Sequence, residues 1–245
     1  MIAAALAAAG PVIPDFGGGG ASDRCVSENA SFCMDWFREN WSDLFVPALR
    51  EHVKLTVIAI VIGFAISTVL ALLAHRLRWT EKPITVVTGI LYTIPSLALF
   101  QLLVPITKLS LLTAEIALVS YTLLILFRNM LEGLRGVPAD VRDAARGMGL
   151  TDRQVLWKVE LPLALPAIVA GLRIATVTII SLATVAAFVV NEGLGRLIFA
   201  AIQSDVFKTE LVAAGGLAVA MALFADAAFV LLQRRLTPWV RARAR

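Results

Sequence analysis

The stretch that decides the fold covers residues 137–166 and reads VPADVRDAARGMGLTDRQVLWKVELPLALP. It is a long polar interruption between apolar segments, and its local signals predict two short helices with a break between them. Pro138 suits the first turn of a helix, where a missing N–H costs little. Gly147 and Gly149 permit the left-handed backbone that ends a helix. The first helix is therefore expected between Pro138 and these two glycines.

The second helix of this stretch begins with a capping box. Thr151 is followed three residues later by Gln154, so each side chain can satisfy a backbone group of the other residue. Leu161-Pro162 then predicts an extended exit, because proline disfavours a helical residue before it. Basic side chains occur from residue 128 onward, at Arg128, Arg135, Arg142, Arg146, Arg153 and Lys158. These signals predict a basic helix–glycine–helix wedge over 138–160, set between apolar spans, which another protein can bind.

Composition indicates an integral membrane protein. Of the 245 residues, 59% are hydrophobic and 16% are charged, and the mean hydropathy is +0.82. A soluble domain of average composition has about 25% charged residues. The net charge of +4 is not a nucleic-acid signal, because the basic residues lie in loops beside apolar runs. Two His and two Cys argue against a metal cluster, so no metal site is expected.

Five apolar segments are long enough to cross a bilayer, since a spanning helix needs about 20 residues. We predict an all-α protein with spans at about 55–74, 84–106, 111–131, 167–190 and 211–233. Residues 1–10 are apolar but too short to span, and they lack the basic start of a signal peptide, so no cleavage is expected. The chain then divides into an N-terminal segment (1–54), a transmembrane domain (55–233) and a basic tail (234–245).

The loops between the spans predict the orientation. Segments 75–82, 128–165 and 234–245 together hold 14 Lys and Arg residues. The loops on the opposite side hold only Lys108, Arg196 and Lys208. Because Lys and Arg are enriched on the cytoplasmic side, the wedge and the tail are expected inside and the N-terminus outside.

The N-terminal segment carries seven acidic and four basic residues within 1–54, which also favours the outer side. Outside the cytoplasm Cys25 and Cys33 can pair as a disulfide, and two free thiols are the alternative. Residues 33–51 place large apolar side chains at helical spacing among charges, which predicts an amphipathic helix in the membrane interface. These side chains are Trp36, Phe37, Trp41, Leu44 and Phe45.

The spacing within 137–166 resembles the EAA loop of ABC-importer permeases. The usual pattern is Glu-Ala-Ala, a glycine four residues on, and a later β-branched residue followed by any residue and Leu-Pro. Here the matching residues are Asp143, Ala144, Ala145, Gly149, Leu161 and Pro162. Asp for Glu at 143 keeps the carboxylate and shortens its reach. The resemblance implies a type I permease core with five helices, N-out and C-in, and coupling helices that dock on an ATPase.

Further segments resemble the osmoprotectant permeases, which import glycine betaine, carnitine or choline. These segments are 93–99, 128–129, 161–166, 186–188 and 234–238. The family usually continues after 188 with Ile-Gly-x-Gly-Gly-Leu-Gly. This chain has Val-Val-Asn-Glu-Gly-Leu-Gly at 189–195, so two glycines are replaced and a carboxylate appears. That departure concerns the range of substrates more than the fold.

The resemblance also implies partners. The chain has no G-x-x-x-x-G-K-[ST] motif, so Mg-ATP is expected on a separate subunit and the chain itself is not an enzyme. The family assembles two permease chains, identical or paralogous, with two ABC ATPase subunits and an extracytoplasmic binding protein. The expected location is the bacterial cytoplasmic membrane, with the lipid bilayer and no nucleic acid as surroundings.

Polar and aromatic side chains within the spans are candidates for the translocation path. Pro95 frees a backbone carbonyl in the second span, which is tolerated only against protein or a water-filled path. Helix packing through small and hydroxyl residues is the alternative for these positions. The candidates are Tyr92, Thr93, Pro95, Ser96, Tyr121, Asn129, Thr184, Asn191 and Glu192.

Two charges lie inside the last spans. Asp226 is expected about 12 Å inside the cytoplasmic end of span five, in an anchoring role. Arg173 in span four is expected to extend toward the cytoplasm.

Other functions remain as alternatives. One is a permease of the same fold for another small, amino-acid-like solute. A second is a self-sufficient secondary transporter, which would show inverted repeats and more charges at mid-membrane. A membrane enzyme is disfavoured because the sequence carries no His-rich or nucleophile motif.

Overall fold

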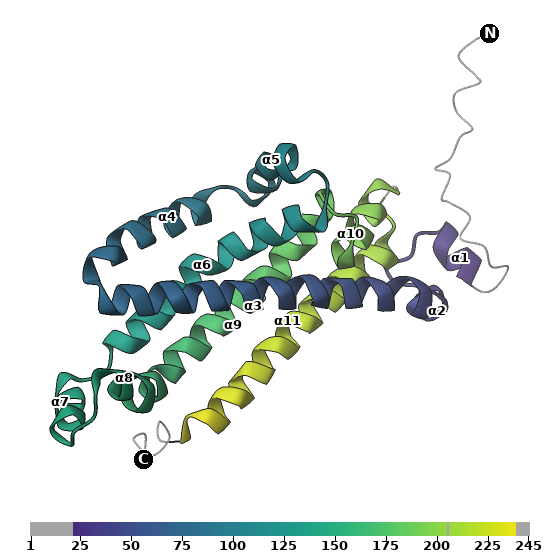
Figure 1. The fold of residues 1–245 in the computed structure, drawn as a ribbon. Helices are drawn as coiled ribbons and strands as arrows, with labels where there is room; N and C mark the ends of the chain where they lie inside the picture. Colours follow the sequence, from purple (N-terminus) through teal and green to yellow (C-terminus); the bar gives the residue numbers. More distant parts are fainter. Residues whose placement is uncertain (1–21, 205, 239–245) are drawn as a thin grey trace, which may run out of the picture.

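The structure is a computed structural model that describes residues 22–204 and 206–238, and these residues form helices joined by short turns (Figure 1). The α-helices are α1 (Ser22–Ser27), α2 (Met34–Glu39), α3 (Val46–Arg76), α4 (Glu81–Thr93), α5 (Ser96–Thr107), α6 (Leu111–Arg135), α7 (Ala139–Gly147), α8 (Asp152–Val155), α9 (Leu161–Val185), α10 (Gly193–Gln203) and α11 (Lys208–Leu236). Short π-helical turns precede α3 (Trp41–Phe45) and α9 (Leu156–Glu160). Short 3₁₀ turns precede α4 (Arg78–Thr80) and follow α9 (Ala186–Phe188).

Three long helices form the centre of the bundle. Helix α6 packs against both α3 and α9, and α11 packs against α9 and α10. Helices α4 and α5 cover α6. The central core joins large apolar side chains of these helices, among them Leu55, Phe100, Leu118 and Ile179. All four of these side chains are fully buried, so the bundle is held by ordinary close packing.

Among the described residues, four helical segments are long and apolar enough to cross a membrane. They are Trp41–Arg76, Leu111–Arg135, Asp152–Phe188 and Lys208–Leu236. The predicted first, third, fourth and fifth spans therefore correspond to real helices, each longer than its predicted core.

The second predicted span is not one straight helix. Helices α4 and α5 meet at an angle of 98° across Ile94 and Pro95. Both residues have extended backbone, with ψ of 128° and 136°. Proline disfavours a helical residue before it, and its ring excludes the N–H that a continuous helix would need. The prediction of a kink within one span over 84–106 was too mild, because the pair forms either a broken span or a re-entrant loop.

The helix predicted over 33–51 is not one continuous helix. Helix α2 ends at Glu39, and residues from 46 onward already belong to the first long helix. The aromatic side chains pack on one another: Trp36 contacts Phe45 edge to face at 6.0 Å and Phe207 at 4.8 Å between ring centroids. Trp36 and Phe45 are fully buried. Their helical spacing therefore reflects burial in a small cluster, although Trp41 in the same segment remains exposed.

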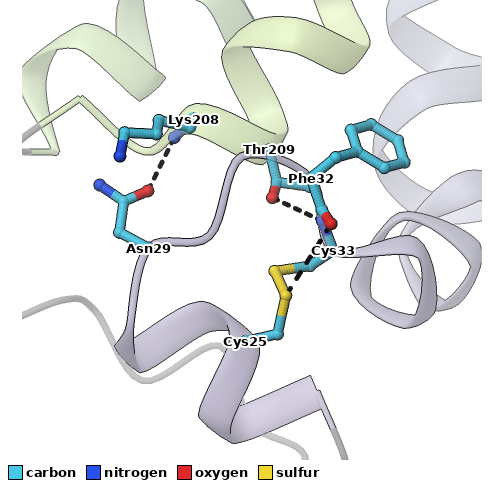
Figure 2. The surroundings of a disulfide bond; sticks show 6 residues. All are labelled: Cys25, Asn29, Phe32, Cys33, Lys208 and Thr209. Carbon is cyan, nitrogen blue, oxygen red and sulfur yellow. Dashed lines mark hydrogen bonds between the residues drawn. A yellow bond between two sulfur atoms is a disulfide. The ribbon is translucent and has the colours of Figure 1, made fainter.

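This N-terminal cap, residues 22–45, is fastened to the start of α11. Cys25 and Cys33 form a disulfide, which confirms the pairing that the sequence left open (Figure 2). The Cys33 N–H donates to the Thr209 hydroxyl at 2.9 Å. The Asn29 amide nitrogen donates to the Val206 carbonyl, and the Asn29 amide oxygen accepts from the backbone N–H of Lys208, both at 3.0 Å. The cap thus holds the α10–α11 connection through covalent, polar and aromatic contacts.

Helix α10 was not predicted, because its eleven residues were taken for a short loop. Its first N–H groups are satisfied by side chains at the beginning of α3: Gly193 donates to the Glu51 carboxylate at 2.8 Å, and Leu194 donates to His52 Nδ1 at 3.3 Å. The His52 Nε2–H in turn donates to the carbonyl of Ile180 in α9 at 3.0 Å. Two adjacent side chains of α3 therefore place α10 against the bundle.

The molecule has two distinct ends (Figure 1). Helices α7 and α8 project from one end, where helices α3, α6 and α11 also end. Helices α2, α5 and α10 gather at the other end. We refer to these as the α7 end and the α10 end.

Candidate functional site

The wedge over 138–160 contains the capping box and the glycine break that its sequence predicts. Thr151 accepts from the backbone N–H of Gln154, and the Gln154 side chain accepts from the N–H of Thr151 at 2.9 Å, so the capping box is complete. Gly149 has a φ of +87° and forms the break between α7 and α8. Gly147 is the last residue of α7 and has no positive φ. A left-handed backbone was expected at both glycines, and only Gly149 adopts it.

The predicted extended exit at Leu161-Pro162 is wrong. Leu161 is helical, with φ −60° and ψ −47°, and Asp152–Phe188 runs as one helical segment. A proline ring normally clashes with the carbonyl four residues earlier. Here a π-helical turn, Leu156–Glu160, lies immediately before Leu161-Pro162, and its wider backbone makes room for the ring. The same arrangement occurs before Pro47, where the turn Trp41–Phe45 precedes α3.

The structure divides the six predicted coupling residues into two groups. Asp143, Ala144 and Gly149 are exposed on the wedge, and Ala145 is its buried contact. Leu161 and Pro162 are half-buried in the first turn of α9. The wedge therefore presents one face outward, while its continuation belongs to the spanning helix.

A buried carboxylate, which the sequence analysis did not single out, connects the wedge to the bundle. Glu160 is 5% exposed, and its Oε2 accepts a hydrogen bond from His75 Nε2 in α3 at 2.9 Å. A carboxylate only accepts, so the histidine donates. Arg142 of α7 lies 3.7 Å from the other carboxylate oxygen. Glu160 thus joins α3, α7 and the start of α9. Its sequence signal was weak, because the partners lie 85 and 18 positions away.

The wedge also carries exposed ion pairs. Arg146 contacts Asp143 at 3.3 Å and Asp152 at 3.1 Å, which links α7 to the start of α8. All three side chains are more than half exposed, so this network contributes little to stability, about 0–1 kcal/mol for each pair. Its charges instead remain available to a partner.

At the bend between α4 and α5, two of the predicted path residues meet. The Tyr121 hydroxyl of α6 donates to the carbonyl of Ile94, which the bend has freed from helical pairing. The rings of Tyr92 and Tyr121 contact edge to face with centroids 5.9 Å apart. Tyr121 is buried, whereas Tyr92, Thr93 and Pro95 are exposed and Ser96 is half-buried. The bend therefore presents an aromatic and polar surface that is braced from behind by Tyr121.

The structure does not bring the other predicted path residues into this group. The Asn129 side chain donates to the Ile125 carbonyl of its own helix and packs on Gly171 of α9. Thr184 donates to the Ser181 carbonyl, also within its own helix. These contacts are those of helix packing, the alternative that the sequence left open.

Asn191 lines a cavity of about 410 Å³ at the α10 end. The cavity is also lined by Arg196, Phe188 and Phe199. Glu192 is the residue before α10 and is half-buried. It lies 57 or more positions away in sequence from the helices that carry the tyrosine pair.

The two charges in the last spans form a pair. Arg173 Nε and Nη2 donate to the two Asp226 carboxylate oxygens at 2.8 and 3.0 Å. Arg173, which was expected to extend toward the cytoplasm, has a bidentate partner on the adjacent helix α11. The expected anchoring role of Asp226 agrees with this contact.

Comparison with known proteins identifies the chain. A model of the family described as "binding-protein-dependent transport system inner membrane component" matches residues 54–241. The chain belongs to this family. It is a transmembrane permease subunit of an ABC importer, with the type I fold, and it lies in the bacterial inner membrane.

Individual relatives agree with this assignment. The choline transport system permease protein OpuBB of Bacillus subtilis is 32% identical over 189 residues, covering 77% of this chain and 86% of that protein. The carnitine transport permease protein OpuCB of Listeria monocytogenes is 33% identical over 206 residues, covering 84% and 93%. A chain of the inward-facing MetNI methionine ABC transporter superposes with a TM-score of 0.74 at 21% identity, covering 82% of this chain and 98% of that one, and so supports the fold.

Proposed function

We propose that this permease imports small quaternary-ammonium osmoprotectants such as choline, carnitine or glycine betaine. The relatives named for choline and carnitine transport, which match most of this chain, carry the proposal. Two permease chains, identical or paralogous, would assemble with two ATPase subunits that bind Mg-ATP and with an extracytoplasmic binding protein. The permease chain itself performs no catalysis.

In this proposal the α7 end faces the cytoplasm and the chain crosses the membrane five times, with the α4–α5 pair as one broken span. The distribution of Lys and Arg supports this orientation. The exposed face of the wedge, with Asp143, Ala144 and Gly149, would dock on the ATPase, and closure of the ATPase would act on α9 through the continuous helix that begins at Asp152.

The translocation path in this proposal passes the bend between α4 and α5. Tyr92 and Tyr121 offer ring faces and edges, and a permanent cation is attracted to aromatic faces without exchanging a proton, by about 0.5–2 kcal/mol. Thr93, Pro95 and Ser96 line the same bend. Four further residues are assigned to the path by their positions along the bundle: Asn129, Thr184, Asn191 and Glu192. Glu192 would lie at the outer mouth.

Substrate charge gives the test of this assignment. Glu192→Gln should slow the uptake of choline, a net cation, by about two- to fivefold at low ionic strength, because negative potential at an entrance raises the local concentration of cations. Uptake of glycine betaine, which is net neutral, should change less. The measurement is radiolabelled uptake into proteoliposomes that contain the assembled transporter.

The matched control for this test is Glu39→Gln, since Glu39 is an exposed carboxylate of the N-terminal cap and does not line the cavity. It should leave the ratio of choline to betaine uptake unchanged. Added salt should reduce the difference between substrates, because the Debye length is about 8 Å at physiological ionic strength. Equal slowing of both substrates at low salt would remove Glu192 from the path, and transport of neither would assign the chain to another small solute.

The proposed orientation has an independent test in the disulfide. After intact cells are treated with a membrane-impermeant reductant, an impermeant maleimide should label both Cys25 and Cys33. As the control, Asp140→Cys on the exposed start of α7, in a Cys25→Ser/Cys33→Ser background, should be labelled only after permeabilisation. The reverse pattern of labelling would invert the topology of every span.

A further inference from the structure

A groove at the α7 end lies between the first long helix and the turn that begins the fourth. Its volume is about 550 Å³, and it is lined by Val69, Leu72, Leu73 and Arg76 of α3 and by Arg153, Leu156 and Trp157. The lining is almost wholly apolar apart from the two arginines. Val69 is 66% exposed and Trp157 is 59% exposed, so the groove opens outward from the bundle.

The groove continues the outer face of α3. Large apolar side chains along this helix are exposed at helical spacing, at Ile62, Ile66, Val69 and Leu73. The stripe has no partner helix within the described chain and contains no charged side chain between these positions on that face. In a membrane protein such a face contacts hydrocarbon, and it leads directly into the groove.

Two positive charges lie where the stripe ends. Arg76 is the last residue of α3 and Arg153 lies in α8, and both are exposed. Within residues 22–204 and 206–238 neither makes an ion pair, and no acidic side chain lines the groove. Arg76 also lines the neighbouring cavity, but the carboxylates there already have partners: His75 pairs with Glu160 and Arg146 pairs with Asp152.

We propose that this groove binds an anionic phospholipid, with an acyl chain along the apolar wall and the phosphate between Arg76 and Arg153. Arginine holds a phosphate through several N–H donors at once, and its aliphatic stem can lie along apolar surface while the head reaches the interface. Tryptophan is enriched at membrane interfaces, so Trp157 suits a site of this kind. The site is independent of the solute path; only the naming of the leaflet as cytoplasmic rests on the proposed orientation.

Lipid retention tests the site. The full chain, purified in detergent with equal amounts of phosphatidylglycerol and phosphatidylcholine, should keep phosphatidylglycerol selectively through gel filtration, as measured by lipid mass spectrometry. Each of Arg76→Gln and Arg153→Gln should lower retention by about fivefold, because each Lys or Arg near the surface contributes to attraction for anionic lipid. Trp157→Ala should lower it with both charges intact.

The control is Arg78→Gln, which removes an exposed arginine two positions beyond Arg76 that does not line the groove. It should retain as much phosphatidylglycerol as the unchanged chain. The double variant Arg76→Lys/Arg153→Lys should retain more than the double glutamine variant, which separates loss of charge from loss of folding. Equal retention by the unchanged chain and the double glutamine variant would overturn the proposal. A second result would also overturn it: inorganic phosphate displaces all the bound phosphatidylglycerol, and Trp157→Ala retains as much of this lipid as the unchanged chain. That result indicates a site for a soluble anion.

Discussion

Gly149→Val should abolish solute uptake while the protein still inserts in the membrane and assembles. Gly149 has a φ of +87°, and a β-branched residue is a genuine outlier in this region. A left-handed conformation costs an ordinary residue roughly 1–2 kcal/mol. The space around Gly149 is open, so the effect comes from the backbone and not from a clash. Valine would therefore shift the break, and α7 and α8 would no longer keep the mutual angle with which they face a partner.

The wedge supplies its own control for this prediction. Gly147→Ala also adds a side chain in open space, but Gly147 ends α7 with ordinary helical backbone. Uptake by Gly147→Ala should stay close to that of the unchanged protein, and alanine there is expected to favour the helix slightly. The measurement is ATP-driven uptake in proteoliposomes together with the amount of assembled transporter. Normal uptake by Gly149→Val would contradict the docking role of the wedge.

The local chemistry of the wedge was predictable because it depends on neighbouring residues. The capping box needs only Thr151 and Gln154, and the break needs only a residue that tolerates positive φ. The exit at Leu161-Pro162 was not predictable by the same rule. The preference against helix before proline assumes a regular α-helix upstream, whereas a π-helical turn occupies that place. A π-helical turn also precedes Pro47, so the two longest helical segments accommodate a proline in the same way.

Helix α10 shows a different limit of prediction. Its sequence retains the two glycines that the geometry requires. Gly193 has a φ of +75°, and a Cβ on Gly195 would lie 2.1 Å from the Thr184 carbonyl oxygen. These requirements come from the close approach of α10 to the end of α9 and were invisible without it. The contacts that hold α10, from Glu51 and His52, come from 142 positions earlier.

The N-terminal cap was misread for a related reason. Aromatic side chains at helical spacing predict a helix with one apolar face. The sequence does not say whether lipid or protein covers that face. Phe207, which completes the cluster with Trp36, lies 171 positions away. The disulfide was easier to anticipate, because Cys25 and Cys33 are close in sequence.

The second large effect is expected at Glu160. Glu160→Gln should lower uptake by about tenfold or more while ATP hydrolysis by the assembled transporter continues. Hydrogen bonds to charged groups contribute about 1.5–3 kcal/mol, and a tenfold change corresponds to about 1.4 kcal/mol. Glutamine keeps the volume but removes the charge that holds His75 at 2.9 Å and attracts Arg142 at 3.7 Å. The wedge would then move without pulling α3 along.

Glu81→Gln is the matched control, because it removes the same charge from the ion pair of Glu81 with Arg135, whose side chains are about one third exposed. Exposed pairs contribute about 0–1 kcal/mol, so uptake and hydrolysis should both change little. A double-mutant cycle of Glu160→Gln with Arg142→Gln, measured on uptake, gives the interaction energy between these two side chains, since residues in contact are non-additive. If Glu160→Gln and Glu81→Gln behave alike, or if hydrolysis and uptake fall together, Glu160 is a structural contact. If Glu160→Gln lowers uptake much more than it lowers ATP hydrolysis, this buried carboxylate transmits the motion of the wedge to the spanning helices.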